Sequence, residues 1–382
     1  MKIICCKSKD AYAEQAFRLR YDVFINEMGY LIDSVDHERQ IDCDEIDAFS
    51  NIYVVIDQDR VVATARVVYS KACELSNHIS KEIADGWQLD NFIEHFPKSV
   101  AVSTKFVILP EYRGTLAAIR LTSQMYQDLL RDGIVFLFSI CSPSMIELYQ
   151  QLAFRFYAPA YPDSIGVTIP IIQAVYDWDY MKSIKSPLLK AIGDHKENRV
   201  QEASVDWFYR QFGKKLDVFV RDVTEKEIHK AIENHLTSRR QAEKDIFFNM
   251  SLADMQTILS ECKVIQYRKN QIIFKEGQQE DDLFLILEGT VQIVARDPNR
   301  KEYTLASGDS FGEKESYQER GRTYTSLALS DSTFIVIARH LINRLSKKNP
   351  QLMAQFFKNL ELCVSQIPYG QEQKMSQPAL LP

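Results

Sequence analysis

The sequence predicts an α+β protein with two folded units joined by a helical linker, and three observations support this. Strand-like and helix-like runs alternate from residue 1 to about residue 190. Residues 191–245 are charged and helical in pattern, whereas residues 246–363 contain short strand-like runs separated by turn signals. A chain of 382 residues is long enough for two such domains, each with a sizeable core. We expect the polar tail, residues 364–382, to be disordered.

Composition and charge argue against several classes of protein. An apolar content of 46% and a charged content of 26% are typical of soluble globular chains, and the net charge of -6 offers no basic surface for nucleic acid. Seven scattered cysteines without a C-x-x-C pair favour neither a disulfide framework nor a zinc site, and the histidines do not cluster at ligand spacings. We expect a cytoplasmic protein without a membrane span, a signal peptide or a bound metal.

The first unit contains the clearest alternation of strands and helices. Its first helix places Ala13, Phe17, Arg20 and Phe24 near one face, which is the helical period, and the two central strands join through a tight turn. The expected elements are the strand Met1–Cys6, a helix from about Asp10 to Met28, strands Ile52–Ile56 and Val61–Tyr69, a partly helical segment Cys73–Phe96, the strand Val100–Leu109, the helix Thr115–Arg131, the strand Ile134–Ile140 and the helix Pro143–Leu152.

A candidate anion site lies between the strand Val100–Leu109 and the helix that follows it. The connecting residues are Pro110-Glu111-Tyr112-Arg113-Gly114. Amide groups at a helix start attract phosphate, Arg113 would add charge, and Gly114 would allow a close approach of the backbone. The pattern therefore predicts a pyrophosphate site at the start of the long helix.

Two motifs resemble the GNAT acyltransferase superfamily. The Arg113-Gly114 loop resembles the one that binds the pyrophosphate or pantetheine arm of the acyl donor, and the run Tyr149–Phe154 is similar to the Tyr-x-x-x-Gly-Phe ending, with alanine at the glycine position. The resemblance implies a mixed sheet with flanking helices, and it implies that Tyr149 reprotonates the leaving thiolate. It places the acyl donor, acyl-CoA or acyl-carrier protein, on Phe106, Val107, Arg113, Gly114 and Thr115. Alternatively, Tyr149 is a half-buried aromatic residue of a helix.

The N-terminal half resembles autoinducer synthases and long-chain N-acyl amino acid synthases. The similar segments are Phe17–Phe24, Asp44–Asp47 and Ala63–Val67. The resemblance implies an acceptor site that contains Arg20, Phe24, Asp44, Asp47 and Arg66, and we expect Lys105 to add a charge to it. The base would be Asp44 or Asp47 acting through water, or the amine would simply be deprotonated before it attacks the thioester. Alternatively, Arg20 and Arg66 form internal ion pairs with Asp44 or Asp47 and hold a loop.

The strand before the anion site differs from that of the lactone synthases. Those enzymes carry a glutamate and an arginine there, whereas this chain reads Val102-Ser103-Thr104-Lys105-Phe106. The carboxylate that would orient a homoserine-type substrate is missing. We therefore expect N-acylation of an amine such as an amino acid rather than lactone production.

The second unit carries the components of a site for a cyclised nucleotide phosphate. Strand-like runs at Gln271–Phe274, Asp282–Leu287 and Val291–Ala295 precede Phe311-Gly312-Glu313, a short helical stretch and Arg322-Thr323. A carboxylate can accept a hydrogen bond from a ribose hydroxyl, and a buried guanidinium can bind a phosphate through two donors. Amide groups at the short helix complete an anion site.

These motifs resemble the cyclic nucleotide-binding domain family over about Ile246–Cys363. The resemblance implies a β jelly roll in which Glu313 binds the ribose, Arg322 binds the phosphate, and Thr323 binds a phosphate oxygen or the base of cAMP or cGMP. Phe311, Gly312 and Lys314 would complete the site. Lys314 and Glu315 stand where the family has small and apolar residues, so a jelly roll that has lost its ligand is the alternative.

Together the two resemblances imply an N-acyltransferase regulated by a cyclic nucleotide, with the charged helices of residues 191–245 as the moving element. The expected partners are the acyl donor, an amine acceptor and the nucleotide, and pairing into a homodimer through flanking helices is a further hypothesis. Two alternatives remain: a non-catalytic sensor that binds the acyl donor, and a protein-lysine acyltransferase under the same control.

Overall fold

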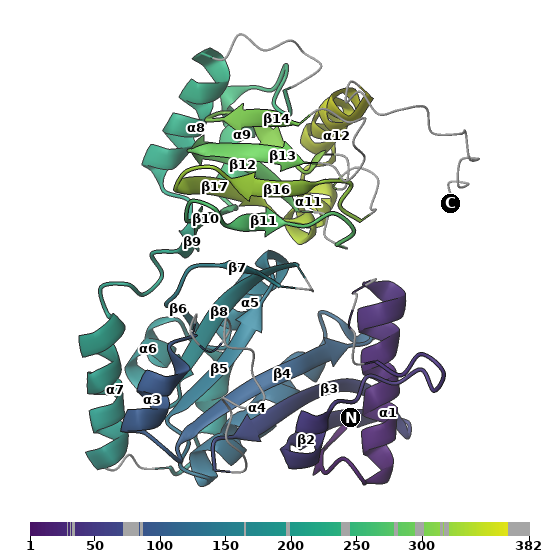
Figure 1. Cartoon of the computed structure of the whole chain (residues 1–382), viewed down its shortest axis with the longest axis vertical. Coiled ribbons are helices and arrows are strands. Elements are labelled where there is room, and N and C mark those ends of the chain that lie inside the picture. The colour runs from purple at the N-terminus through teal and green to yellow at the C-terminus, as the bar shows by residue number, and fades with distance from the viewer. Residues whose placement is uncertain are drawn as a thin grey trace.

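The computed structural model describes residues 1–28, 30, 32, 35–71, 84, 87–163, 166–195, 199–237, 245–278, 282–294, 302–313, 316 and 321–365. Figure 1 shows two domains stacked along the long axis of the molecule. The N-terminal domain contains one large mixed sheet, and the C-terminal domain contains two smaller antiparallel sheets. The α+β class is confirmed. The tail that was expected to be disordered lies outside the described residues from position 366 onward.

The N-terminal sheet has the strand order β1-β2-β3-β4-β5-β8-β6, with β7 paired to β8. Strands β4 and β5 are parallel, which requires a crossover, and the helix α4 provides it. Strands β6 to β8 were not predicted. The strands are β1 (Lys2–Cys6), β2 (Asn51–Asp57), β3 (Arg60–Tyr69), β4 (Val100–Ile108), β5 (Phe136–Cys141), β6 (Arg155–Phe156), β7 (Tyr161–Asp163) and β8 (Gly166–Ala174).

The helices of this domain bury apolar faces against the sheet. The expected helix Asp10–Met28 is an α-helix only as far as Tyr21 and continues as a π-helical segment, Asp22–Glu27. Of the expected segment Cys73–Phe96, the end is helical and most of the start lies outside the described residues. The helices are α1 (Ala11–Tyr21), α3 (Leu89–His95), α4 (Ala117–Arg131), α5 (Ile146–Gln151), α6 (Trp178–Ser183) and α7 (Arg199–Phe212), with short 3-10 turns at Glu45–Phe49, Pro110–Tyr112, Pro143–Met145 and Pro187–Ala191.

A bulge in β4 opens the sheet at its centre. Thr64 of β3 pairs with Val107 whereas Arg66 pairs with Thr104, so β4 contains one extra residue there, and Lys105 has a φ of 55°. Such a bulge bends its strand and interrupts the ladder. Pairing of β4 with β5 is confined to residues 100–102 and 136–138. Beyond these residues the two strands separate, and the candidate donor site lies at this separation.

Residues 199–237 are shared between the two domains. The α7 helix packs Trp207, Phe208 and Phe212 into the N-terminal core. The strand β9 (Val220–Asp222) pairs with β10 of the C-terminal domain, and α8 (Glu225–Thr237) packs into a core of that domain. The charged segment is therefore largely committed to one core or the other.

The C-terminal domain is a two-sheet β barrel of the jelly-roll type. Its sheets have the orders β15-β12-β17-β10-β9 and β11-β16-β13-β14, and they enclose a core that includes four phenylalanines, Phe274, Phe284, Phe311 and Phe334. The elements are α9 (Leu252–Leu259), β10 (Lys263–Tyr267), β11 (Ile272–Phe274), β12 (Leu283–Glu288), β13 (Thr290–Val294), β14 (Tyr303–Ala306), β15 (Ser310–Phe311), β16 (Thr325–Ala328), β17 (Ser332–Ile337), α11 (Arg339–Lys348) and α12 (Pro350–Ser365).

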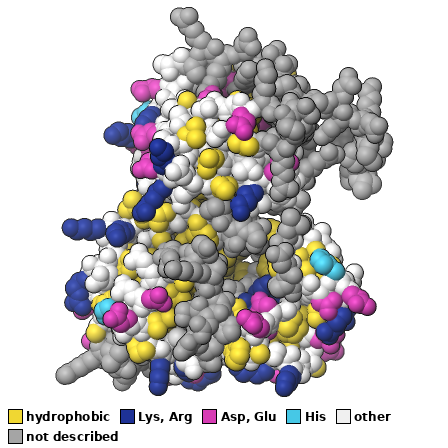
Figure 2. Space-filling model, in the orientation of Figure 1, with side chains coloured by type: hydrophobic (Ala, Val, Ile, Leu, Met, Phe, Trp, Pro, Cys, Tyr) yellow, Lys and Arg dark blue, Asp and Glu magenta, His cyan; other side chains and the backbone are white. Residues whose placement is uncertain are grey.

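The surface is charged and mixed in sign over both domains. On the face drawn in Figure 2, hydrophobic side chains gather where the two domains meet. Among the described residues, no helix has both the length and the apolar character needed to cross a bilayer.

Candidate functional site

A small cavity lies beside the point where β4 and β5 separate. Its volume is about 20 Å³, which is roughly the room for one water molecule. A thioester arm would therefore need side chains to move apart. The lining is mainly apolar and comes from both strands, α4, α5 and neighbouring segments: Ser103, Phe106, Thr122, Met125, Tyr126, Leu129, Leu137, Tyr149, Leu152, Phe154, Gln173 and Leu188.

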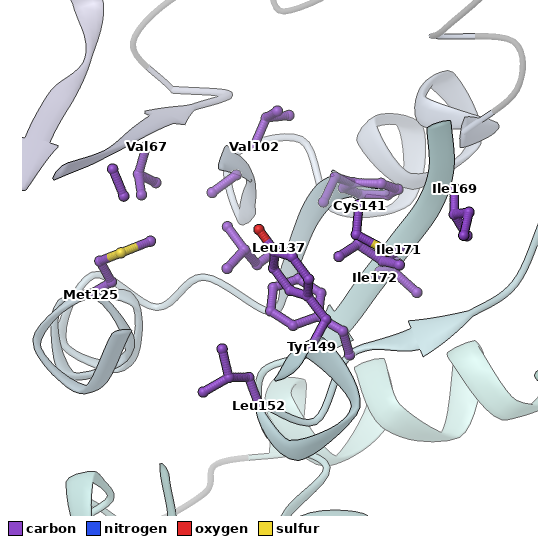
Figure 3. Packing of buried hydrophobic residues seen from close by; sticks show 14 of the residues in the cluster. Val67, Val102, Met125, Leu137, Cys141, Tyr149, Leu152, Ile169, Ile171 and Ile172 are labelled. Carbon is purple, nitrogen blue, oxygen red and sulfur yellow. The ribbon is translucent and has the colours of Figure 1, made fainter. Parts of the chain in front are cut away.

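Tyr149 lies at this cavity and is more deeply buried than a half-exposed helix aromatic. Figure 3 shows its side chain rising from α5 toward the strands, with its oxygen beside Leu137. Its ring packs against Phe106 and Phe154, at centroid distances of 6.3 and 5.1 Å. Burial raises the pKa of Tyr149, although a hydrogen bond with Ser139 opposes this. The phenol therefore stays protonated at neutral pH and can act as an acid.

The predicted anion site lies at the start of α4. Arg113 forms a two-pronged ion pair with Glu27, with Nη1–Oε1 and Nη2–Oε2 distances of 2.5 and 2.7 Å. Gly114 has a φ of 74°, which favours glycine. The Thr115 hydroxyl accepts a hydrogen bond from the Ala117 amide, so α4 begins at Ala117 rather than at Thr115. The charge of Arg113 is thus already neutralised by Glu27, which was not among the predicted site residues.

The donor residues on β4 point in different directions. Phe106 lines the cavity beside Tyr149. Val107 is buried in the sheet, opposite Thr64. The two residues follow the bulge at Lys105, so the bulge decides which side chain reaches the cavity.

The candidate acceptor residues form one ion-paired cluster. Arg20 and Asp47 are both 0% exposed, with an Nη1–Oδ1 distance of 2.9 Å. Arg66 forms ion pairs with Asp44 and, at 3.2 Å, with Asp47. This is the geometry of the internal ion-pair alternative. Among the described residues, Nε and Nη2 of Arg20 have no hydrogen-bond partner.

A fourth ion pair joins the acidic loop that carries Asp44 and Asp47 to the bulge. Lys105 Nζ lies 2.8 Å from both carboxylate oxygens of the buried Asp42, and it lies over the Phe24 ring, 5.6 Å from its centroid. Asp42 was not among the predicted site residues, although it precedes Cys43-Asp44 in the same acidic loop. Within the described part of the chain, no three His, Cys, Asp or Glu side chains are arranged to hold a metal ion.

The two candidate bases differ in their access to solvent. Asp47 is fully buried, whereas Asp44 keeps 19% of its side chain exposed. Burial tends to raise the pKa of Asp44, but the charge and hydrogen bond of Arg66 hold it below the usual value. Asp44 also caps the 3-10 turn at Glu45–Phe49. Asp44 is thus ionised at neutral pH and is the more accessible of the two.

In the C-terminal domain Arg322 points into the barrel. It is 1% exposed, its Nη2 donates to the Asp282 carbonyl at 2.8 Å, and its guanidinium lies 4.0 Å from the Phe274 ring centroid. Gly312 has a φ of 92°, and a Cβ there would lie 2.8 Å from Arg322 Nη1. Only glycine fits this close approach. The fold thus brings Gly312 and Arg322 together.

The other selected residues of this site lie at different depths. Glu313 is buried, and Thr323 is half-buried between the buried Arg322 and Tyr324. Phe311 stacks on Phe284 at a centroid distance of 5.0 Å and is part of the core. Lys314 lies outside the described residues.

Tyr324 also lies at this candidate site, although it was not among the predicted residues. Its hydroxyl oxygen accepts a hydrogen bond from the Gly312 amide at 2.7 Å, and its ring lies 5.3 Å from that of Phe274. The alternation Arg322-Thr323-Tyr324 could have identified it, because residues two apart in an extended chain point to the same side. The Gly312 amide, which belongs to the candidate phosphate site, is therefore already hydrogen-bonded to the Tyr324 side chain.

Comparisons with known proteins fit the two domains. Residues 19–123 match the family model described as an acetyltransferase (GNAT) domain, and residues 264–349 match the cyclic nucleotide-binding domain. The chain is 27% identical over 159 residues to the L-ornithine N(alpha)-acyltransferase of Rhodobacter capsulatus, which covers 39% of this chain and 60% of that protein. It is 30% identical over 97 residues to the lysophospholipase nte1 of Aspergillus fumigatus, which covers 25% of this chain.

Each of these two relatives is matched over only part of its own length. The chain spans 6% of the length of that lysophospholipase. Among solved structures, this chain is similar to the CoA-dependent acyl-homoserine lactone synthase BjaI, with 14% identity and a TM-score of 0.39. The aligned region covers 53% of this chain and 98% of the BjaI chain. The chain therefore combines an N-terminal domain of the GNAT acetyltransferase family with a C-terminal cyclic nucleotide-binding domain.

Proposed function

We propose that this protein is an N-acyltransferase that moves an acyl group from acyl-CoA or an acyl-carrier protein to an amino acid-like amine, under the control of a cyclic nucleotide. The observation that carries the acyltransferase half is the separation of β4 from β5, with Tyr149 beside it and the Arg113 loop at the start of α4. The GNAT match and the ornithine N-acyltransferase relative support the same chemistry.

The donor would bind along the opened edge of β4. Its pyrophosphate would meet the first amides of α4 and would displace Glu27 from Arg113, because both anions compete for one guanidinium. The thioester would then reach the cavity at Tyr149. The acceptor amine attacks the thioester carbonyl carbon, the amide bond forms, the C–S bond breaks, and the leaving thiolate takes the phenolic proton.

The acceptor would lie over the ion-paired cluster. Lys105 and Asp44 keep 13% and 19% of their side chains exposed, and they carry opposite charges. A zwitterionic acceptor could place its carboxylate near Lys105 and its amine near Asp44, which would take the amine proton through water. Arg20, Asp47 and Arg66 would then position this pair rather than contact the acceptor.

The nucleotide would bind where Gly312 and Arg322 meet. Arg322 would bind the phosphate and Glu313 the ribose, with the half-buried Thr323 at the rim. The alternative, a jelly roll without a ligand, is favoured by one observation: Tyr324 already accepts the Gly312 hydrogen bond.

The test is a panel of amino acids with acyl-CoA or acyl-carrier protein donors, in which thiol release and the acylated product are measured together. We expect thiol release that depends on a free amino acid and is reduced in Arg113→Ala and Tyr149→Phe. Absence of release with every donor would support the non-catalytic alternative. Release only with a protein acceptor would support lysine acylation.

A further inference from the structure

The helix that carries Tyr149 is held by side chains of the C-terminal domain. Arg344 of α11 bonds Glu147 of α5 through both guanidinium ends, with distances of 2.9 and 3.2 Å. Lys263 of β10 donates to the Gln150 side chain at 3.0 Å. The residues two before and one after Tyr149 are thus both bound across the domain boundary.

Apolar packing surrounds these polar contacts. Ile146 from α5 and Leu341 from α11 line one cavity of about 10 Å³, together with Val336 at the end of β17. A cavity this small leaves little room for one helix to move without the other. In Figure 1, α5 lies at the end of the N-terminal domain that faces the C-terminal domain.

The other end of α11 contacts the nucleotide site. Arg339, the first residue of α11, donates its backbone amide to Asp282 Oδ1 at 3.1 Å, and its guanidinium donates to the Ser316 carbonyl. The Ser316 amide in turn donates to the Gly312 carbonyl at 3.0 Å. Asp282 is also the residue whose carbonyl holds Arg322. Arg339 therefore contacts both segments that would receive the phosphate.

We infer that Arg344 is the positioning residue through which the nucleotide site controls the acyltransferase site. A phosphate that binds at Gly312 and Arg322 shifts Asp282 and Ser316. Because Arg339 is bonded to both of these residues, it moves with them. Arg339 begins α11, so the whole helix of ten residues moves as a rigid unit. Arg344 then moves α5 through Glu147, and with it Tyr149. This inference rests on the proposed function. It assigns the coupling between the two sites to α11 and α5 instead of residues 191–245, because α7 and α8 are each packed into one core.

The experiment uses the full chain with cAMP and cGMP as probes. Binding is read from the shift in melting temperature, and coupling is read from the ratio of kcat/KM with and without nucleotide. Exchange of amide hydrogens in residues 146–151 reports on α5 without the need for activity. The variants are Arg344→Ala, Glu147→Ala and the double variant. Gln271→Ala is the matched control, because Gln271 donates to the Ala160 carbonyl across the same boundary without contacting α5.

We expect each single variant to keep the nucleotide-induced melting shift and to lose a factor of about 2 to 5 from the coupling ratio. The double variant should lose no more than either single one, and nucleotide should no longer change exchange in α5. The control should behave as the wild type. If Arg344→Ala keeps the wild-type coupling ratio and the wild-type change in amide exchange of residues 146–151, this inference is overturned and the proposed function is not. Wild-type protein that binds neither nucleotide would overturn it together with the regulatory half of the proposed function, while thiol release would still stand as evidence of acyl transfer.

Discussion

Replacement of Tyr324 by phenylalanine should strengthen nucleotide binding. The hydroxyl of Tyr324 accepts a hydrogen bond from the Gly312 amide at 2.7 Å, and a Cβ on Gly312 would lie 2.8 Å from Arg322 Nη1. Phenylalanine keeps the ring that packs 5.3 Å from Phe274 and removes the hydroxyl that accepts from the Gly312 amide. The amide is then available to a phosphate oxygen without a bond to break.

The expected magnitude follows from the hydrogen bond that is lost. A hydrogen bond within a protein contributes about 0.5–1.5 kcal/mol net, so removal of the competing acceptor should lower the dissociation constant by roughly 2- to 12-fold. The nucleotide-free variant should lose stability of about 1–3 kcal/mol, because a buried amide is left without an acceptor. Tighter binding and lower apo stability are thus expected together.

Titration calorimetry with cAMP and cGMP measures this directly. Tyr303→Phe is the matched control, because Tyr303 is an exposed tyrosine on β14 of the same domain. If Tyr324→Phe binds nucleotide with unchanged or weaker affinity while its circular dichroism spectrum is native, the hydroxyl does not compete with the ligand, and the reasoning is refuted.

Three further predictions concern single side chains. Tyr149→Phe should lower kcat for thiol release by about 10²-fold, the lower end for loss of a general acid, and the raised pKa of Tyr149 should leave the wild-type rate profile without a tyrosine limb between about pH 6 and 9. Gly312→Ala should abolish the nucleotide-induced melting shift, since its Cβ would lie 2.8 Å from Arg322 Nη1. Hydrogen bonds from Arg221 lower the pKa of Glu227 from 4.5 to about 2, so the melting difference between wild type and Glu227→Gln should be full above pH 4.5 and vanish as the pH falls toward 2.

Elements with a clear hydrophobic period were predictable from the sequence. The strand expected at Val61–Tyr69 is found at Arg60–Tyr69, and the helix expected at Thr115–Arg131 differs only in its first turn. Strand β8 was missed because Pro170 interrupts its apolar run, and a proline within such a run argues against a strand. The two-residue strand β6 carries too little pattern to be recognised.

The ion pairs of Arg20 and Arg66 with Asp44 and Asp47 were one of the alternatives read from the sequence. The partners of Arg113 and Lys105 could not be predicted, because each partner lies far away in the chain. Glu27 reaches Arg113 across 86 positions, and Asp42 reaches Lys105 across 63. Neither pair lies within one element, where spacing would indicate a contact. The motifs therefore selected candidate residues, while the fold decides which of them are already bound to each other.

These internal partners bear on how the protein could be regulated. Arg113 is bonded to Glu27, Arg322 is bonded to Asp282, and the Gly312 amide is bonded to Tyr324. Each proposed ligand must displace a protein group to reach its site, which weakens its binding. The same displacement makes the free and bound states differ in internal contacts, and a ligand can shift an equilibrium only through such a difference. A nucleotide site with the same internal contacts in its free and bound states could not move α11, so under the proposed regulation the displaced contacts are what would link the nucleotide to the acyltransferase domain.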